Sequence, residues 1–141
     1  MERRELLLQM RKNHTLKGLK PAFVSLKINS GKIYTGGNAN FILSLDKNIL
    51  FFQKISFIFK KLKPKEDFEI NAKRFKEYEF SGNSYIRKLT LYDAEGYFLE
   101  INFLAGTKDS ISTVDNIDRI IKELKQTIGL KEVNYDEYEN E

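Results

Sequence analysis

Residues 113–128 read TVDNIDRIIKELKQTI, and this stretch decides how the chain folds. Apolar side chains recur there every three or four residues and form one stripe along a helix, at Val114, Ile117, Ile121, Leu124 and Ile128. Ser112 or Thr113 can cap the start, and Gly129 is a typical stop. The pattern predicts an amphipathic helix over residues 113–128 that buries one face against a core.

The residues before this helix, from about 22 to 104, form a ladder of short apolar strands rich in Phe, Tyr, Ile and Leu. We expect about seven strands, because turn residues interrupt the apolar runs at 29–31, 36–38, 46–48, 82–83 and 93–96. Hairpins followed by one helix predict a mainly β fold with some α, a bent antiparallel sheet or partly open barrel capped by the helix. An OB-fold, a lipocalin-like barrel and a parallel α/β sheet would each need a different order or length of elements.

Residues 1–14 predict a short N-terminal helix whose apolar positions include Leu6, Leu7 and Met10. Acidic residues come early and basic residues late, which suits the helix dipole. So short a helix is not stable alone in water, and it must dock on something. Two alternatives are open: the helix covers the sheet, or Leu6, Leu7 and Met10 bind a protein partner.

One domain accounts for the 141 residues, of which 41% are apolar and 31% charged. We expect the N-terminal helix at 1–14, the main domain at 15–129 and an acidic flexible tail at 130–141. The chain has no cysteine, which excludes disulfides, thiolate metal sites and cysteine nucleophiles. It has neither a signal-peptide pattern nor a run of ~20 apolar residues. We therefore expect a soluble cytoplasmic protein with no transmembrane segment.

The strand and helix pattern of residues 22–128 resembles the pleckstrin-homology-like (PH-like) and GRAM-like domains of bacteria. Residues 41–52, FILSLDKNILFF, are similar to a hairpin of these domains in which a strand ends in a Ser-x-Asp turn and returns as an apolar strand. Residues 68–78, FEINAKRFKEY, resemble their next element, and residues 86–104 and 113–128 resemble their last hairpin and capping helix. The resemblance implies a non-enzymatic binding or scaffolding module. In relatives, basic loops between strands often contact phosphorylated lipid headgroups.

Charge is divided unevenly along the chain. Residues 1–65 hold 14 Lys and Arg against 3 Asp and Glu, a balance of +11, whereas residues 66–141 hold 10 against 17, a balance of −7. A basic half favours an anionic partner or self-association between unlike faces; the alternative is that the fold mixes both halves in space and dilutes the asymmetry. The densest cluster, expected in a loop, consists of Lys60, Lys61, Lys63 and Lys65. It predicts contact with an anionic lipid surface or with nucleic acid, and each lysine contributes about 1 kcal/mol near an acidic membrane. The alternative is that these lysines only blunt a sheet edge and keep the protein soluble.

The sequence indicates no catalytic centre, metal site or cofactor. His14 is the only histidine, so neither a His-based metal site nor a catalytic triad can form around a second one. Glu77 and Glu79 share a strand face, which is more typical of a solvated face than of an acid–base pair. Turn glycines at 31 and 36–37 lack the phosphate-loop spacing. Core packing, rather than stacking on nucleic-acid bases, is expected for Phe51, Phe52, Phe57 and Phe59.

Two functional hypotheses follow, and neither is an enzyme. The first is a binding or scaffolding module whose ligand is a protein partner, a second copy of the chain or an anionic membrane surface. The alternative is a nucleic-acid-associated protein that uses the basic N-terminal half.

Overall fold

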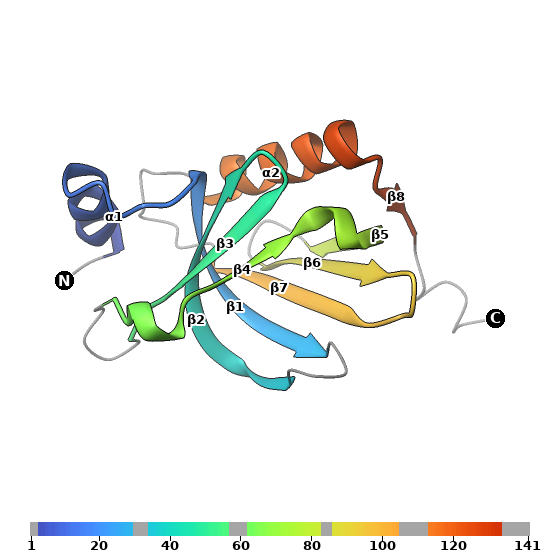
Figure 1. Cartoon of the computed structure of the whole chain (residues 1–141), viewed down its shortest axis with the longest axis horizontal. Helices are drawn as coiled ribbons and strands as arrows, with labels where there is room; N and C mark the ends of the chain where they lie inside the picture. Colours follow the sequence, from blue (N-terminus) through green and yellow to red (C-terminus); the bar gives the residue numbers. More distant parts are fainter. Residues whose placement is uncertain (1–2, 30–33, 57–61, 83–85, 105–112, 134–141) are drawn as a thin grey trace.

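Eight strands form a single sheet in the computed structural model, which describes residues 3–29, 34–56, 62–82, 86–104 and 113–133 (Figure 1). The strands are β1 (Leu19–Asn29), β2 (Tyr34–Asp46), β3 (Ile49–Lys54), β4 (Phe68–Asn71), β5 (Phe75–Gly82), β6 (Ile86–Asp93), β7 (Phe98–Leu104) and β8 (Lys131–Glu132). The helices are α1 (Arg3–Lys12) and α2 (Thr113–Ile128), with short 3-10 turns η1 (Pro64–Glu66) and η2 (Ala72–Arg74).

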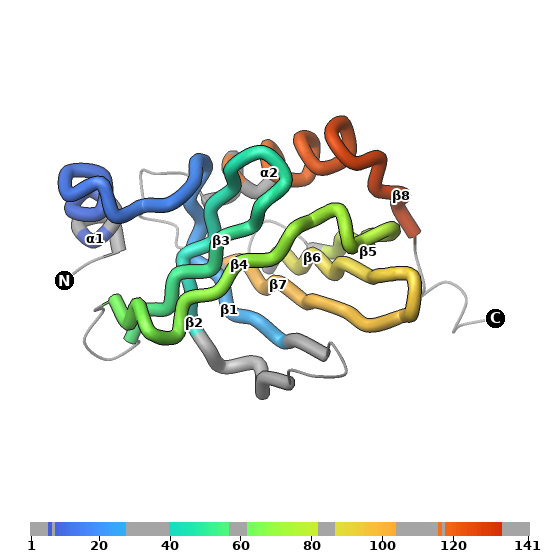
Figure 2. The backbone as a smooth tube through the Cα atoms, in the orientation of Figure 1, coloured from blue at the N-terminus to red at the C-terminus, as the bar shows by residue number. Residues whose placement is uncertain are grey.

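The sheet has the order β4-β3-β2-β1-β7-β6-β5-β8. Its long strands pair antiparallel, while β8 runs parallel to β5 and makes the sheet mixed. Since β4 and β8 are the two edges, the sheet is not closed into a barrel. The tube in Figure 2 shows the two halves of the sheet curling toward each other, with α2 along one side. The predicted architecture, a mainly β sheet with an N-terminal and a C-terminal helix, is confirmed.

The second strand is longer than predicted. We expected a break at residues 36–38, but β2 continues through them. Its register with β1 shifts there, from Leu26 opposite Ala39 to Lys27 opposite Gly36. Two residues of β2 therefore have no partner in β1 and form a bulge. The glycines therefore mark an irregularity within a strand rather than its end.

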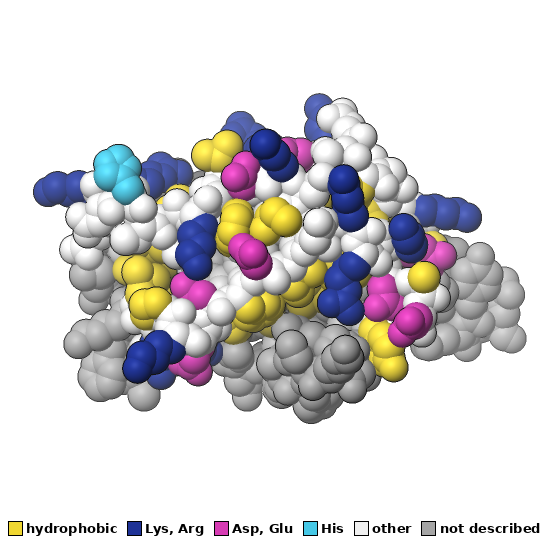
Figure 3. All heavy atoms as spheres, viewed as in Figure 1, with side chains coloured by type: hydrophobic (Ala, Val, Ile, Leu, Met, Phe, Trp, Pro, Cys, Tyr) yellow, Lys and Arg dark blue, Asp and Glu magenta, His cyan; other side chains and the backbone are white. Residues whose placement is uncertain are grey.

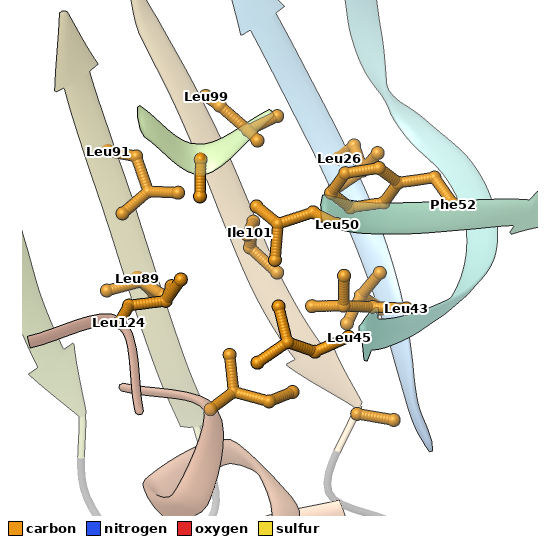
Figure 4. Packing of buried hydrophobic residues seen from close by; sticks show 14 of the residues in the cluster. Leu26, Leu43, Leu45, Leu50, Phe52, Leu89, Leu91, Leu99, Ile101 and Leu124 are labelled. Atoms are coloured by element: carbon orange, nitrogen blue, oxygen red, sulfur yellow. The ribbon is translucent and has the colours of Figure 1, made fainter. Parts of the chain in front are cut away.

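The main core lies inside the curled sheet. Buried side chains from β1, β2, β3, β6 and β7 point at one another there, and Leu124 of α2 joins them (Figure 4). An aromatic group lies at the β2-β3-β4 side, where Phe52 stacks on Phe68 with ring centroids 4.9 Å apart. The rings of Phe41 and Phe68 pack edge to face, with their centroids 5.3 Å apart. Phe52 is thus a core residue, as predicted, while Phe57 and Phe59 lie outside the described residues.

The capping helix α2 has the predicted bounds, but its buried stripe is slightly rotated. Ile120 and Leu124 are its most buried described side chains, and Ile121 and Ile128 are only partly buried. The predicted stripe omitted Ile120. Two further expected members of the stripe have side chains outside the described set, namely Val114 and Ile117.

Two glycines end their elements as predicted. Gly129 follows α2 with φ 67°, and its N–H donates to the Lys125 carbonyl at 3.1 Å. Gly96, with φ 89°, closes the β6–β7 hairpin. Asp93 Oδ1 accepts from the N–H groups of Glu95 and Tyr97 in the same hairpin.

The domain does not end at residue 129. Leu130 is buried, β8 pairs with β5, and the N–H of Val133 donates to the carbonyl of Tyr78 at 2.8 Å. The predicted boundary of the flexible tail is therefore at least four residues too early. The acidic residues predicted to be mobile, 134–141, lie outside the described part of the chain.

The N-terminal helix packs on the outer face of the β1-β2-β3 half of the sheet. Leu6 and Met10 are 5% and 1% exposed and form a second apolar cluster with Phe23, Ile42 and Ile55. The sequence left open whether this helix covers the sheet or binds a protein partner, and in the structure α1 covers the sheet. A partner could reach Leu6 or Met10 only if α1 left the sheet, and the side chain of Leu7 is outside the described set.

Candidate functional site

The segment between α1 and β1 is fastened to the sheet by two buried polar side chains. Gln53 of β3 accepts from the N–H of Lys17 at 3.1 Å and donates to the carbonyl of Thr15 at 2.8 Å. Ser44 of β2 accepts from the N–H of Gly18 at 3.1 Å. These bonds satisfy backbone groups that have no strand neighbour, so they fix the path of residues 15–18.

The start of β1 is irregular at the point where this segment enters the sheet. Leu19 lies opposite Leu45 but Ala22 lies opposite Leu43, so β1 holds one extra residue. Lys20, within this bulge, has φ 55°. A side-chain-bearing residue in the left-handed region costs on the order of 1 kcal/mol, which the surrounding structure must offset.

The bulge separates an exposed leucine from the core. Leu19 is 67% exposed, whereas Ala22 is fully buried. On the other side of the bulge, Lys20 Nζ pairs with Glu123 Oε2 of α2 at 2.5 Å, and the Asn116 amide of α2 donates to the Pro21 carbonyl at 2.8 Å. The helix therefore holds the start of β1 in place while Leu19 faces solvent.

A cavity of about 370 Å³ opens beside Leu19. Its apolar lining comes from Met10, Leu16, Leu19 and Pro21, and its basic groups from Arg11, His14 and Lys20. His14 also has a positive φ of 55° at the end of α1. The cavity thus joins an apolar surface to cationic side chains, which suits a ligand that is both apolar and anionic.

Five cationic side chains lie at this end of the molecule, on α1, its connector and η1, and we call them the basic end: Arg11, Lys12, Lys17, Lys63 and Lys65. The first three belong to α1 and its connector, and the last two flank or belong to η1. Lys17 Nζ lies 3.8 Å from Asp67 Oδ2, which joins the two groups in space. Figure 1 shows α1 and η1 at the same end of the molecule. In Figure 3, dark blue side chains lie over that end and also over the rest of this face.

Acidic residues neutralise only part of the basic end. Lys17 is near Asp67, and Lys63 Nζ lies 3.9 Å from Glu66 Oε2, with both of these lysines about half exposed. Such exposed pairs contribute roughly 0–1 kcal/mol and exchange readily for another anion. Within the described ranges, no ion pair involves the other three members, Arg11, Lys12 and Lys65.

The predicted lysine cluster is only half described. Lys63 and Lys65 are exposed around η1, as expected for a loop that contacts a ligand or keeps the protein soluble. Lys60 and Lys61 lie outside the described residues. The structure adds to them the basic side chains of α1 and its connector and the exposed Leu19, which the sequence did not indicate; of the cavity's apolar lining, only Met10 was a candidate from the sequence.

A signal for this addition is present in the sequence. Residues 6–45 contain no Asp or Glu but six Lys and Arg. This acid-free run contributes +6 of the +11 balance of residues 1–65, and the exposed Leu19 lies within it. The bulge in β1 that exposes Leu19 comes from the register between β1 and β2. The acid-free composition of residues 6–45 does not predict this bulge.

The structure also places the remaining candidates from the sequence, on the outer face of the sheet and in β3. Glu79 accepts from the Tyr92 hydroxyl at 3.1 Å on the outer face of the sheet, opposite the core. Phe51 is partly buried on β3. Among the described residues, no group of three or more His, Asp or Glu side chains could hold a metal ion. No described helix combines the length and the apolar character that crossing a bilayer requires.

Comparison with known proteins gives little beyond this geometry. No protein-family model matches the chain, and no curated protein matches it. A solved structure with a similar course is the hSac2 domain from the human phosphoinositide phosphatase Sac2. It is 13% identical, the match covers 95% of this chain and 92% of that one, and the TM-score is 0.47. At this level the likeness carries no argument about function.

Proposed function

We propose that this chain is a non-enzymatic binding module of the PH-like kind, which docks through its basic end on an anionic membrane surface at the cytoplasmic side. The observation that carries the proposal is Leu19, an aliphatic side chain that is 67% exposed on a fastened backbone and lies among basic residues. Leu8 of α1 is a second exposed leucine, at 47%.

Aliphatic and cationic groups together suit a lipid surface. Each lysine or arginine near an acidic membrane contributes about 1 kcal/mol. A leucine that enters the acyl region contributes about 1.5–3 kcal/mol at full burial. With two of the five cations partly neutralised by Asp67 and Glu66, the sum is about 5 kcal/mol, which corresponds to weak and reversible binding. Nucleic acid would use the cations but offers little to an exposed leucine.

The topology supports the PH-like part of the proposal. The sheet is a meander in which the first strand pairs with β7, its edge strands β4 and β8 are not paired with each other, and an amphipathic helix lies over one side. This is the arrangement expected from the resemblance of residues 22–128. In such a module the loops and termini are free to carry the ligand surface.

Co-sedimentation with vesicles tests the proposal. Wild type should bind vesicles of phosphatidylcholine mixed with phosphatidylserine. It should not bind vesicles made only of phosphatidylcholine. The double variant Lys12→Glu/Lys65→Glu removes two exposed cations and should weaken binding by about 2 kcal/mol, or roughly 30-fold.

The matched control is Lys73→Glu/Lys76→Glu, which changes the net charge equally at two exposed lysines away from the basic end. It should bind almost as wild type does. Equal losses in both double variants would mean that only net charge matters. No binding to the mixed vesicles at low salt would reject membrane docking altogether.

A further inference from the structure

The edge strand β5 already accepts an extended segment. The two residues of β8 pair with it, Lys131 opposite Glu77 and Glu132 opposite Tyr78. The N–H of Val133 then donates to the Tyr78 carbonyl at 2.8 Å. The pairing is short, yet it shows that this edge is accessible and correctly oriented for strand addition.

The edge continues beyond the contact with Val133. In an antiparallel pair, successive residues point their N–H and C=O groups alternately toward and away from the neighbouring strand. Since the Tyr78 carbonyl faces β8, the N–H and C=O of Phe80 face the same edge. Among residues 3–29, 34–56, 62–82, 86–104 and 113–133, no strand pairs with the edge of β5 at Phe80.

A cavity of about 290 Å³ lies beside this edge, between β5 and α2. Tyr78, Phe80 and Ile121 form its apolar part, and Lys122 and Lys125 are exposed at its rim. The Lys125 ammonium lies 5.3 Å from the centre of the Tyr78 ring. The cavity therefore has room for an apolar side chain, with two cations beside it.

Two carboxylates also line this cavity, and one of them is paired with a cation. Asp118 Oδ1 pairs with Arg87 at 2.9 Å. A hydrogen bond and a charge interaction with Tyr78 raise the pKa of Lys125, and Glu132 adds a smaller charge contribution in the same direction. Lys122 is left to attract an anion, so the rim as a whole favours an acidic ligand.

We propose that this groove binds an extended acidic segment of a partner protein, which adds to the edge of β5 at Phe80. The segment places an apolar side chain in the cavity and a carboxylate near Lys122.

The groove and the basic end are separate surfaces. Figure 1 places β8 and the adjoining edge of β5 far from α1 and η1 along the long axis of the molecule. A segment bound in the groove would leave the basic end accessible to a membrane. Variants of one surface should therefore leave binding at the other surface unchanged, and either proposal can fail without the other.

Fluorescence anisotropy with the full chain tests the groove. The probe is a short labelled peptide of alternating Glu and Thr around one central Leu, and the matched peptides carry Lys for Glu or Asn for Leu. The acidic Leu peptide should bind, and both matched peptides should bind several-fold more weakly. Lys122→Glu/Lys125→Glu should weaken its binding about tenfold, as expected from two lost cations that become repulsive.

Two controls make the outcome decisive. Lys73→Glu/Lys76→Glu and the membrane variant Lys12→Glu/Lys65→Glu should bind the acidic peptide as wild type does. Hydrogen exchange at the Phe80 amide should slow when the peptide is bound, because strand addition supplies an acceptor for that N–H. Absent binding, equal weakening by all the charge variants, or unchanged exchange at Phe80 would overturn the proposal.

Discussion

The substitution Gln53→Met tests whether the connector before β1 is held rigidly. The Gln53 side chain is buried and bonds both the N–H of Lys17 and the carbonyl of Thr15. Methionine has a similar shape but can neither accept nor donate as an amide does. The variant therefore removes both bonds while it keeps the volume filled.

The expected loss follows from the two backbone groups left without partners. A buried group without a partner costs about 1–3 kcal/mol. Lys17 and Thr15 are exposed residues, so water can reach their backbone in part and the low end applies. We expect a loss of about 2 kcal/mol in the free energy of unfolding. For a chain of this size, the melting temperature should fall by roughly 6–10 °C.

Thermal unfolding and hydrogen exchange measure this loss. In Gln53→Met, exchange should accelerate at the amides of Lys17 and Gly18 beyond any general effect of lower stability. Leu50→Met is the matched control, because Leu50 lies on the same strand with its side chain in the main core. That volume-conserving change should cost less than about 1.5 kcal/mol and leave the connector protected.

One result would refute the reasoning about the connector. If Gln53→Met melts within about 1 °C of wild type and its Lys17 and Gly18 amides stay protected, Gln53 does not hold this segment. The exposed Leu19 would then owe its position to the β1 bulge alone.

Three further predictions concern single side chains. Gly18→Ala would place a Cβ 2.7 Å from the backbone N of Leu45, so β2 must shift. Urea unfolding should show a loss of about 1–3 kcal/mol in the free energy of unfolding. An unchanged urea midpoint would contradict the close packing. Met10→Ala should cost about 2–5 kcal/mol because the side chain is buried under α1; unchanged stability with a changed oligomeric state would instead favour the partner-binding alternative. Tyr78→Phe should return the raised pKa of Lys125 toward its ordinary value of 10.5 in an NMR titration. The pKa of Lys125 is raised in the folded state, so its interaction with Tyr78 stabilises the fold below the unfolded-state pKa, and this stabilisation is lost as the pH rises through the folded-state pKa. Tyr78→Phe lacks this interaction and should therefore lose less stability than wild type in strong alkali.

Local patterns in the sequence were sufficient for the long elements. The three- and four-residue period of residues 113–128 and the cap at Gly129 fix α2, and alternation fixes the inner faces of β6 and β7. The pairing of β8 was not predictable, because its residues are a polar Lys131–Glu132 pair with no strand pattern. They join the sheet because Leu130 is buried and carries the chain to the edge of β5.

The candidate site was predicted only in part for a similar reason. Lys63 and Lys65 stand out as a basic cluster in one short stretch. The exposure of Leu19 depends on partners distant in sequence, namely the β2 register and Glu123 of α2. Composition can show that residues 6–45 lack acids, but it cannot show which of their side chains face solvent.

Insertion of Leu19 into a bilayer is the most direct test of the membrane proposal. The chain has no tryptophan, so Leu19→Trp creates a single fluorescent reporter at an exposed site. Tyr97→Trp is the control, since Tyr97 is an exposed aromatic residue on the β6–β7 hairpin, outside the basic end. We expect a blue shift of the Leu19→Trp emission with vesicles that contain phosphatidylserine, reversed by salt, and no shift for Tyr97→Trp. An unshifted Leu19→Trp spectrum under conditions in which the protein sediments with those vesicles would contradict it.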